Sequence, residues 1–244
     1  RNYFGNGGKW GISISYCTQR KQLGTADAVR TVENMVSGNF LMINGDIIVD
    51  HEDISNLAHH NNTTMSVIEV EDTRDLGLVE VAGNKVLHIY EKVQKAASNL
   101  ANAGLYLFTP DIFSAISRTQ KSPRGEYEIT DSLQLLTDRG EGIDYQKIVS
   151  WMDVSFPWDL LPANESLLEG VIPQNQGEVE ENAVIRGNVS IGKGTLVRSG
   201  SYIVGPVTIG DNCDIGPNCY IRPCTSIGDN CHIGAAVEIK GSIV

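Results

Sequence analysis

Ile209-Gly210-Asp211-Asn212-Cys213 recurs unchanged at Ile227-Gly228-Asp229-Asn230-Cys231, 18 residues further along the chain. From Val179 to Ile239 every sixth residue is valine or isoleucine, eleven in succession with no exception. A period of six, with three hexads in each 18-residue repeat, is typical of a parallel β-helix in which each coil has three flat faces and equivalent side chains stack from coil to coil. The pattern therefore predicts a solenoid that extends over residues 173–244.

Each hexad of this solenoid buries one aliphatic side chain at the axis, which contributes roughly 1.5–3 kcal/mol. Cys213 and Cys231 are expected at equivalent positions of consecutive coils. They could form a bridge or a metal pair, but reduced cysteine is also a small apolar filler, and we favour that interpretation. The five cysteines include no Cys-x-x-Cys pair, so their spacing predicts neither a disulfide framework nor a zinc site. A reducing, cytoplasmic compartment is expected.

The first two thirds of the chain alternate strand and helix patterns, which predicts an α/β domain around a mostly parallel sheet. Two strand patterns separated by Ala82-Gly83-Asn84 interrupt this alternation and predict an antiparallel insertion. A helix is expected to begin at Pro157 and to pack its leucines inward. The expected strands are residues 11–16, 40–43, 65–70, 77–81, 85–92 and 103–108. The other expected helices lie at residues 26–37, 53–60 and 111–116, and a further one carries Ile129, Leu133 and Leu136 on one stripe.

Residues 40–46, Phe40-Leu41-Met42-Ile43-Asn44-Gly45-Asp46, join a short apolar run to a turn and a carboxylate. This is the layout of an acid at the carboxyl end of a buried strand, where α/β sheets bind their ligands. Asp153 follows a second apolar run, and two such carboxylates could hold Mg²⁺ together with substrate phosphates. Asn44-Gly45 is equally a hairpin signal, in which case Asp46 would only be solvated.

The charge balance argues against nucleic acid as a partner, because 30 acidic residues against 19 basic ones give a net charge of −11. A small anionic ligand bound through a metal is still compatible with this charge. No window approaches 18 consecutive apolar residues and no secretory leader opens the sequence, so neither a membrane span nor a signal peptide is expected.

Seven motifs in a fixed order, followed by the hexads, give the chain its resemblance to sugar-1-phosphate nucleotidylyltransferases. It looks closest to the bifunctional archaeal-type enzymes, similar to glucosamine-1-phosphate uridylyltransferase, that join this domain to a left-handed β-helix acetyltransferase. The resemblance implies an incomplete Rossmann-like nucleotidyltransferase domain in residues 1–172 and a left-handed β-helix in residues 173–244. The motifs are Gln19, Gln22-Leu23-Gly24-Thr25-Ala26, Asn44-Gly45-Asp46, Glu91-Lys92, Glu128-Ile129-Thr130-Asp131, Trp151-Met152-Asp153 and Pro157-Trp158-Asp159.

The same resemblance implies roles for individual residues. Asp46 and Asp153 would hold Mg²⁺ at the catalytic centre, and Lys92 would act beside them at the sugar phosphate. The nucleobase would contact Gln19, Gly24 and Thr25, and the sugar would contact Gly77, Glu91 and Asn102.

The implied reaction is in-line attack of a sugar-1-phosphate oxygen on the α-phosphorus of a nucleoside triphosphate, which gives a nucleotide sugar and pyrophosphate. The nucleotide would be UTP or dTTP, with the Leu-Gly-Thr-Ala form favouring uracil, and the acceptor glucose-1-phosphate or N-acetylglucosamine-1-phosphate. Acetyl-CoA would serve the second activity, and a homotrimer through the β-helix is expected.

The sequence also departs from the family pattern. The glycine-rich loop that grips the triphosphate has no counterpart in these residues, and neither do the coils expected to carry the acetyltransferase centre. We therefore expect an internal fragment with little turnover of its own. Two alternatives remain: a regulatory or scaffold subunit of the same layout, which the presence of both Asp46 and Asp153 disfavours, and an acetyltransferase whose first domain is vestigial.

Overall fold

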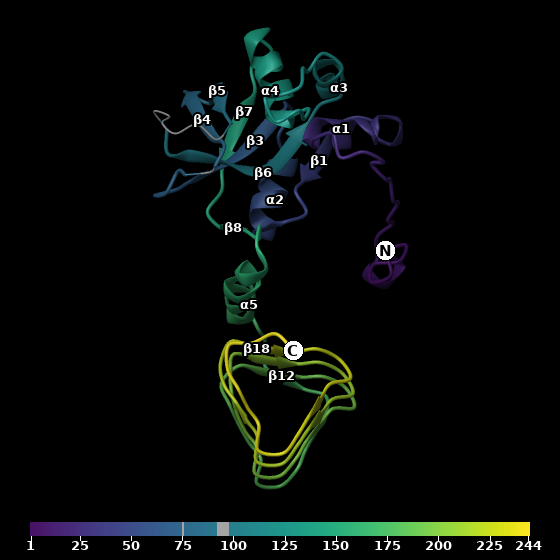
Figure 1. The fold of residues 1–244 in the computed structure, drawn as a ribbon, viewed down its shortest axis with the longest axis vertical. Helices are drawn as coiled ribbons and strands as arrows, with labels where there is room; N and C mark the ends of the chain where they lie inside the picture. The colour runs from purple at the N-terminus through teal and green to yellow at the C-terminus, as the bar shows by residue number, and fades with distance from the viewer. Residues whose placement is uncertain (75, 92–97) are drawn as a thin grey trace. The chain divides into compact units, whose positions relative to one another are not determined.

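The computed structural model of the chain describes residues 1–74, 76–91 and 98–244 (Figure 1). Within it the chain divides into two compact units, residues 1–151 and residues 152–244. The boundary predicted between residues 172 and 173 stays a prediction. Lys92, which the resemblance places at the sugar phosphate, lies outside the described residues.

A six-stranded mixed sheet forms the centre of the first unit. Only the β3–β7 pair is parallel among the described pairs, so the expectation of a mostly parallel sheet was wrong. The cause is β6, which runs antiparallel between β1 and β3. In sheet order the strands are β1 (Phe40–Ile43), β6 (Leu100–Phe108), β3 (Thr64–Glu69), β7 (Asp144–Lys147), β5 (Lys85–Tyr90) and β4 (Leu78–Ala82).

Helices cover both faces of this sheet, α3 and α4 on one side and α2 on the other (Figure 1). The alternation of side chains along β6 explains both layers. Tyr106 and Phe108 join the core beneath α1 (Thr25–Arg30), α3 (Asp111–Ile116) and α4 (Ile129–Asp138). Leu105 and Leu107 point the other way and pack with Leu57 of α2 (His51–Ala58) and with residues of β2 (Ile47–Val49).

The antiparallel insertion is confirmed, because β4 and β5 form a hairpin that turns at Gly83-Asn84. The strand predicted for residues 11–16 is wrong. That segment turns back on the residues before it, around the 3₁₀ turn Gly8–Trp10, and the Ile14 N–H donates to the carbonyl of Asn6 at 2.8 Å. The helix predicted for residues 26–37 is shorter than expected, since α1 ends at Arg30 and a 3₁₀ turn, Glu33–Met35, follows.

In the second unit a 3₁₀ turn, Pro157–Asp159, leads into α5 (Leu160–Glu169), as the sequence predicted. The inward packing of its leucines was wrong: Leu168 is 3% exposed, but Leu161 and Leu167 are 48% and 62% exposed. Polar contacts join α5 to the solenoid. Asn164 donates to the carbonyl of Cys224 at 3.1 Å and accepts from the Ser226 hydroxyl at 2.5 Å.

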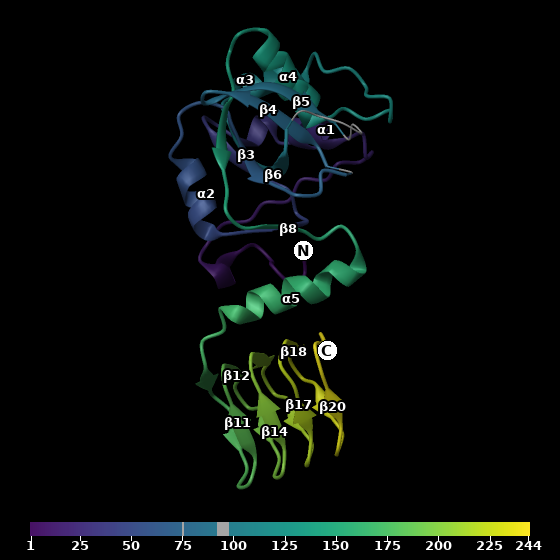
Figure 2. The same cartoon turned by 90° about the vertical axis from the view of Figure 1, so that its left-hand side faces the viewer.

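The hexad region folds into three four-stranded parallel sheets, the flat faces of a β-helix (Figure 2). The 18-residue register is confirmed, since Ile203 pairs with Ile221 and Ile209 with Ile227. The faces contain β9 (Gln174–Asn175), β12 (Val189–Ile191), β15 (Val207–Ile209) and β18 (Thr225–Ile227); β10 (Glu178–Val179), β13 (Leu196–Val197), β16 (Asp214–Ile215) and β19 (His232–Ile233); and β11 (Val184–Arg186), β14 (Tyr202–Val204), β17 (Tyr220–Ile221) and β20 (Glu238–Ile239).

Side-chain donors inside the solenoid join one coil to the next. Four residues after the axial aliphatic position, a hydroxyl or thiol donates to the carbonyl found 15 residues later: Thr195 at 2.6 Å, Ser201 at 2.9 Å, Cys213 at 3.0 Å and Cys219 at 3.1 Å. Cys213 is a free thiol, and so is Cys231 at the equivalent position of the next coil. This agrees with cysteine as a filler.

The repeated Ile-Gly-Asp-Asn-Cys segment has a physical explanation in the same register. Asp229 accepts from the backbone N–H of Asp211, 18 residues earlier, at 2.8 Å, and Asp211 accepts in the same way from Lys193. Gly210 is required because a Cβ there would collide with the Asp229 carboxylate. Asn212 takes the left-handed conformation (φ 54°) that asparagine tolerates better than most residues.

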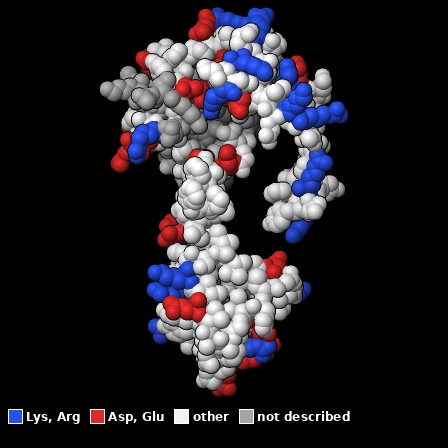
Figure 3. Space-filling view, in the orientation of Figure 1, with Lys and Arg blue, Asp and Glu red and all other residues white. Residues whose placement is uncertain are grey.

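Two further observations concern the surface charge and the apolar character of the helices. On the face shown in Figure 3, lysine and arginine side chains are interspersed with acidic ones. None of the helices in the described part of the chain is both long enough and apolar enough to cross a membrane.

Candidate functional site

The candidate site lies at the edge of the first unit's sheet where β1, β3 and β7 end. These three strands share one direction, so their carboxyl ends meet there. Asp46 lies in the exposed turn after β1. Asn102, near the start of the reversed strand β6, pairs with Val67 near the end of β3. Glu91 directly follows β5 at the same hairpin end where β4 begins.

The three residues predicted to contact the sugar lie together at this edge. The Asn102 N–H donates to the carbonyl of Gly77 at 2.8 Å. A Cβ built on Gly77 would lie 3.8 Å from Glu91 Oε1 and 3.8 Å from Asn102 Cβ. Gly77 therefore leaves the space between the carboxylate and the amide free of a side chain. Their binding role stays a prediction.

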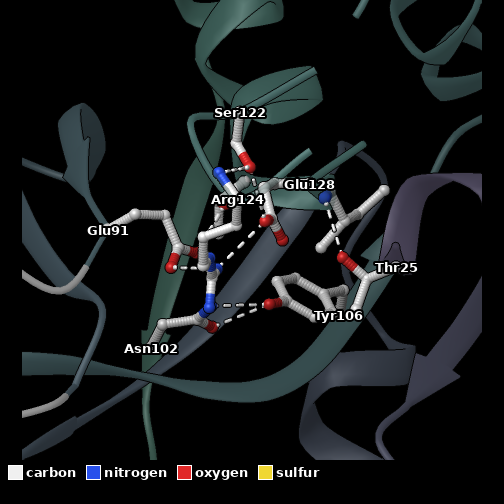
Figure 4. Close-up of polar contacts among 9 residues, drawn as sticks. Thr25, Glu91, Asn102, Tyr106, Ser122, Arg124 and Glu128 are labelled. Carbon is white, nitrogen blue, oxygen red and sulfur yellow. Dashed lines mark hydrogen bonds and ion pairs between the residues drawn. The ribbon is translucent and has the colours of Figure 1, made fainter. Parts of the chain in front are cut away.

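Neighbouring side chains hold both oxygens of the Glu91 carboxylate (Figure 4). The Thr130 hydroxyl donates to Oε1 at 2.6 Å, and the Arg124 guanidinium donates to Oε2 at 3.3 Å. The same guanidinium nitrogen pairs with Glu128 at 3.0 Å, and Glu128 also accepts from Ser122 at 3.1 Å. Sequence reasoning gave Arg124 no role; its only signal was its place just before the Glu128-Ile129-Thr130-Asp131 motif.

Neighbouring groups also make hydrogen bonds to both polar atoms of the Asn102 amide. Its Oδ1 accepts from the Gly104 N–H at 3.1 Å and from the Tyr106 hydroxyl at 2.9 Å, and its Nδ2 lies 2.7 Å from that hydroxyl. Tyr106 is 2% exposed, and burial raises the pKa of its phenol well above the ordinary value. The phenol is therefore neutral and able to donate.

The carboxyl of Asp131 adds negative charge to this cluster. Burial raises the pKa of Asp131 above its ordinary value, and the carboxylates of Glu128 and Glu91 raise it further, while Arg124 opposes them. The Arg124 guanidinium pairs with Glu91 and Glu128, and its charge also acts on Asp131. Such a site is suited to accept hydrogen bonds from a polyhydroxylated ligand.

Of the residues predicted to contact the nucleobase, Gln19 and Gly24 lie in the loop before α1 and Thr25 is the first residue of α1. This segment docks against Tyr127. The Tyr127 N–H donates to the carbonyl of Leu23 at 2.7 Å, and the Ala26 N–H donates back to Tyr127 at 2.9 Å. A Cβ on Gly24, whose φ is 110°, would lie only 2.5 Å from the Tyr127 carbonyl oxygen. The Gln19 amide crosses the loop to the Gly24 carbonyl at 3.1 Å. Thr25 accepts from the N–H of Ile129 at 2.9 Å.

The two predicted metal ligands belong to different units, Asp46 to the first and Asp153 to the second. Asp153, at the end of β8 (Trp151–Asp153), accepts from the Ser155 hydroxyl at 2.6 Å through Oδ2. Two carboxylates are the donor set that Mg²⁺ takes when it keeps waters and substrate phosphates as further ligands. Groups of three or more His, Cys, Asp or Glu placed to bind a metal are absent from the described residues.

The first unit is an α/β domain with polar residues at the carboxyl edge of its sheet, and a β-helix of hexapeptide repeats follows it. The family model described as nucleotidyl transferase matches residues 1–170, and the bacterial transferase hexapeptide (six repeats) matches residues 188–222 and 206–241. The chain belongs to the nucleotidyl transferase family.

Individual relatives support the same assignment. The chain is 36% identical over 191 residues to the bifunctional protein GlmU of Methanococcus maripaludis, covering 77% of this chain and 46% of that protein. It is 35% identical over 196 residues to a bifunctional sugar-1-phosphate nucleotidylyltransferase/acetyltransferase of Sulfurisphaera tokodaii, covering 78% of this chain and 48% of that protein. The chain thus spans about half the length of these relatives.

A solved structure has the same fold over most of the chain. It is that of a putative glucose-1-phosphate thymidylyltransferase from Bacillus anthracis, in complex with a sucrose. The match covers 71% of this chain and 72% of that one, with a TM-score of 0.60 and 27% identity. These comparisons confirm the resemblance and the fold class expected from the sequence.

Proposed function

We propose that the protein transfers a nucleotidyl group from UTP or dTTP to a sugar-1-phosphate, either glucose-1-phosphate or N-acetylglucosamine-1-phosphate. The products are a nucleotide sugar and pyrophosphate. The observation that carries this proposal is the convergence of Gly77, Glu91 and Asn102 at the carboxyl edge of the sheet. Membership of the nucleotidyl transferase family supports it.

The sugar would be held by groups of complementary character. The Glu91 carboxylate accepts from sugar hydroxyls, and the Asn102 amide donates to an oxygen of the sugar. Because Gly77 has no side chain, the volume beside the Glu91 carboxylate stays open to the sugar ring. Lys92, outside the described residues, would neutralise the sugar phosphate as a positioned point charge.

The nucleobase would lie on Gly24, at the end of a loop, and on Thr25, the first residue of α1, with Gln19 supporting the loop. The Gln19 amide nitrogen already bonds the Gly24 carbonyl and Asp27 Oδ2, so Gln19 would fix the loop and offer its carbonyl oxygen to the base. The Thr25 hydroxyl oxygen already accepts from Ile129 and keeps its own proton for donation. Binding and orientation of the two substrates for in-line displacement would supply much of the catalysis.

Magnesium would be held by Asp46 and Asp153, whose carboxylate oxygens suit a hard cation. When bound, it would neutralise phosphate charge. For the β-helix in residues 173–244, the hexapeptide match supports an acetyltransferase activity that uses acetyl-CoA, and a homotrimer in the cytoplasm completes the proposal.

The test is pyrophosphate release by the complete gene product, supplied with Mg²⁺, a nucleoside triphosphate and each sugar-1-phosphate in turn. Asp46→Asn should lower the rate on the order of 100-fold or more, because the metal contributes several kcal/mol to the transition state. Asp111→Asn is the matched control, since Asp111 is an exposed carboxylate that follows the opposite end of β6, and it should keep the normal rate.

Normal turnover by Asp46→Asn would refute the metal role. A gene product that binds a nucleotide sugar but never forms one would instead indicate a regulatory subunit. Consumption of acetyl-CoA without any dependence on a nucleoside triphosphate would indicate an acetyltransferase alone.

A further inference from the structure

Two buried hydroxyl groups bond the side chains proposed to bind the sugar, and Figure 4 shows one of them, that of Tyr106, bonded to Asn102. One belongs to Tyr106 on β6 and the other to Thr130 in the first turn of α4. Tyr106 is 2% exposed and Thr130 is 3% exposed. A buried hydroxyl needs a hydrogen-bond partner, and each of these two finds it on a different side chain of the site.

The Tyr106 ring is part of the core and stacks on Phe108, with 5.2 Å between ring centroids. Packing therefore fixes the position of the ring, and the hydrogen bond from its hydroxyl restricts the movement of the Asn102 side chain. Asn102 Oδ1 accepts from both the Tyr106 hydroxyl and the Gly104 N–H. A half-turn of the amide would place Nδ2 against the Gly104 N–H, which would lose its acceptor, so Nδ2 keeps its orientation. One Nδ2 proton bonds the Tyr106 oxygen, and the other is left to donate to a ligand.

Thr130 plays the equivalent part for the carboxylate. Its hydroxyl donates to Glu91 Oε1 at 2.6 Å, a length typical of a hydroxyl bound to an ionised acceptor. The other partner of Glu91 is weaker: Arg124 lies 3.3 Å from Oε2, is 48% exposed and is shared with Glu128. Because Thr130 is buried and its helix packs on the sheet, it is the rigid support of the two.

We infer that Tyr106 and Thr130 are positioning residues for the sugar, each fixing through one hydroxyl the side chain that binds it. The inference rests on the proposed function, since it presumes that Asn102 and Glu91 contact a sugar-1-phosphate. Two buried residues that would otherwise be regarded only as part of the core thus contribute to recognition of the sugar. Neither residue touches the ligand itself.

Near-isosteric removal of each hydroxyl tests the inference in the complete gene product. Tyr106→Phe and Thr130→Val should each raise KM for the sugar-1-phosphate about 5- to 20-fold, because an unsupported group pays part of its binding energy to become ordered. The KM for the nucleoside triphosphate and kcat should change less than about twofold. Thr130→Ser, which keeps the hydroxyl, should restore KM to near the wild-type value.

Thr119→Val is the matched control, because Thr119 is also buried and its hydroxyl bonds Ser132 at 2.7 Å, between α3 and α4. It should lower thermal stability and leave both KM values unchanged. Should Tyr106→Phe fail to fold, the Thr130→Val and Thr130→Ser pair decides the question alone.

Double variants provide the second readout. In an Asn102→Ala background Tyr106→Phe should have no further effect on KM, and in a Glu91→Ala background neither should Thr130→Val, because each hydroxyl acts through its partner. Independent, multiplicative effects would overturn the inference. So would wild-type KM values in both single variants while the wild type shows saturable dependence on the sugar-1-phosphate, a result that leaves the proposed function intact. A wild type that shows no such dependence would overturn both.

Discussion

The hydroxyl oxygen of Thr25 accepts a hydrogen bond from the backbone N–H of Ile129 at 2.9 Å, across 104 residues of sequence. Ile129 is the first residue of α4, and the Glu128 side chain at the N-cap position makes no capping bond. A residue at the start of α1 therefore caps a different helix. The segment proposed to bind the base is thus hydrogen-bonded to the first turn of α4. That turn also contains Thr130, whose hydroxyl donates to Glu91.

Thr25→Val should destabilise the first unit by about 0.5–2 kcal/mol, because it removes the acceptor for an orphan N–H at a helix start. The measurement is urea unfolding of the wild type and the variant. Thr25→Ser retains the acceptor and should recover most of the loss. Equal destabilisation by valine and serine would show that the methyl group, and not the hydroxyl, is responsible.

Gly24→Ala should be more damaging than Gly125→Ala. Both glycines have positive φ, 110° and 82°, so both substitutions add backbone strain of about 1–2 kcal/mol. A Cβ on Gly24 would also lie 2.5 Å from the Tyr127 carbonyl oxygen, whereas a Cβ on Gly125 meets nothing within 4 Å. Thermal melting should place Gly24→Ala lowest of the three proteins, and a raised KM for the nucleoside triphosphate is expected in that variant alone. Equal melting temperatures would contradict the docked loop.

The stability of the first unit should depend on pH through Asp131. Because burial raises the pKa of Asp131 in the folded state, the folded protein binds this proton more tightly than the unfolded chain does. Its contribution is therefore most favourable at low pH and is lost as the pH rises from the ordinary value of 3.8 through the raised one. Asp131→Asn should melt at a higher temperature than the wild type at pH 7.

That difference should shrink as the pH is lowered toward 3.8, where the wild-type carboxyl is increasingly protonated in both states. The measurement is the melting temperature of both proteins over this pH range. Glu126→Gln, at an exposed position just before α4, is the control and should show no such pH-dependent gain. A gain for Asp131→Asn that stays constant with pH would contradict the electrostatic explanation.

In the β-helix, Ile203→Ala should cost about 2–5 kcal/mol, because Ile203 is fully buried at the axis and the coils on both sides restrict collapse of the cavity. Tyr220→Ala removes a larger side chain, yet Tyr220 is 40% exposed on the outer surface and should cost less. Hydrogen exchange of the solenoid amides would compare the two variants. A reversed order would refute the assignment of the inward and outward positions.

The solenoid was predictable from sequence because its register is local. Each hexad needs an aliphatic side chain at the axis, so the eleven valines and isoleucines between Val179 and Ile239 repeat the same structural signal. The side-chain donors that follow them were visible only as small residues. That Thr195 and Cys213 donate to the next coil depends on a distance between coils, which no single repeat contains.

The pairing of the first sheet was not predictable to the same degree. The continuous apolar run of β6 fits a buried strand of either direction, and its antiparallel insertion between β1 and β3 is decided by contacts across the fold. For residues 11–16, too, the sequence pattern did not determine the structure. Their alternating pattern fits a strand, but the segment bonds to its own preceding turn.

The residues proposed to bind the sugar were predictable from the sequence, but the side chains that support them were not. Gly77, Glu91 and Asn102 were named through the family resemblance, and they do converge. Tyr106 lies in an apolar strand and looks like a core residue, which it also is. Only the fold shows that its hydroxyl reaches back four residues to Asn102.

The coil-to-coil register has a consequence for how such a protein can change in length. Since the strands from β10 to β20 pair between neighbouring coils at positions 18 residues apart, gain or loss of a whole turn by duplication or deletion would keep the register of the remaining coils. A change of one hexad would instead rotate every later side chain onto an adjacent face. Variation by full turns is therefore the step that evolution, or an engineer, can take most easily with this half of the molecule.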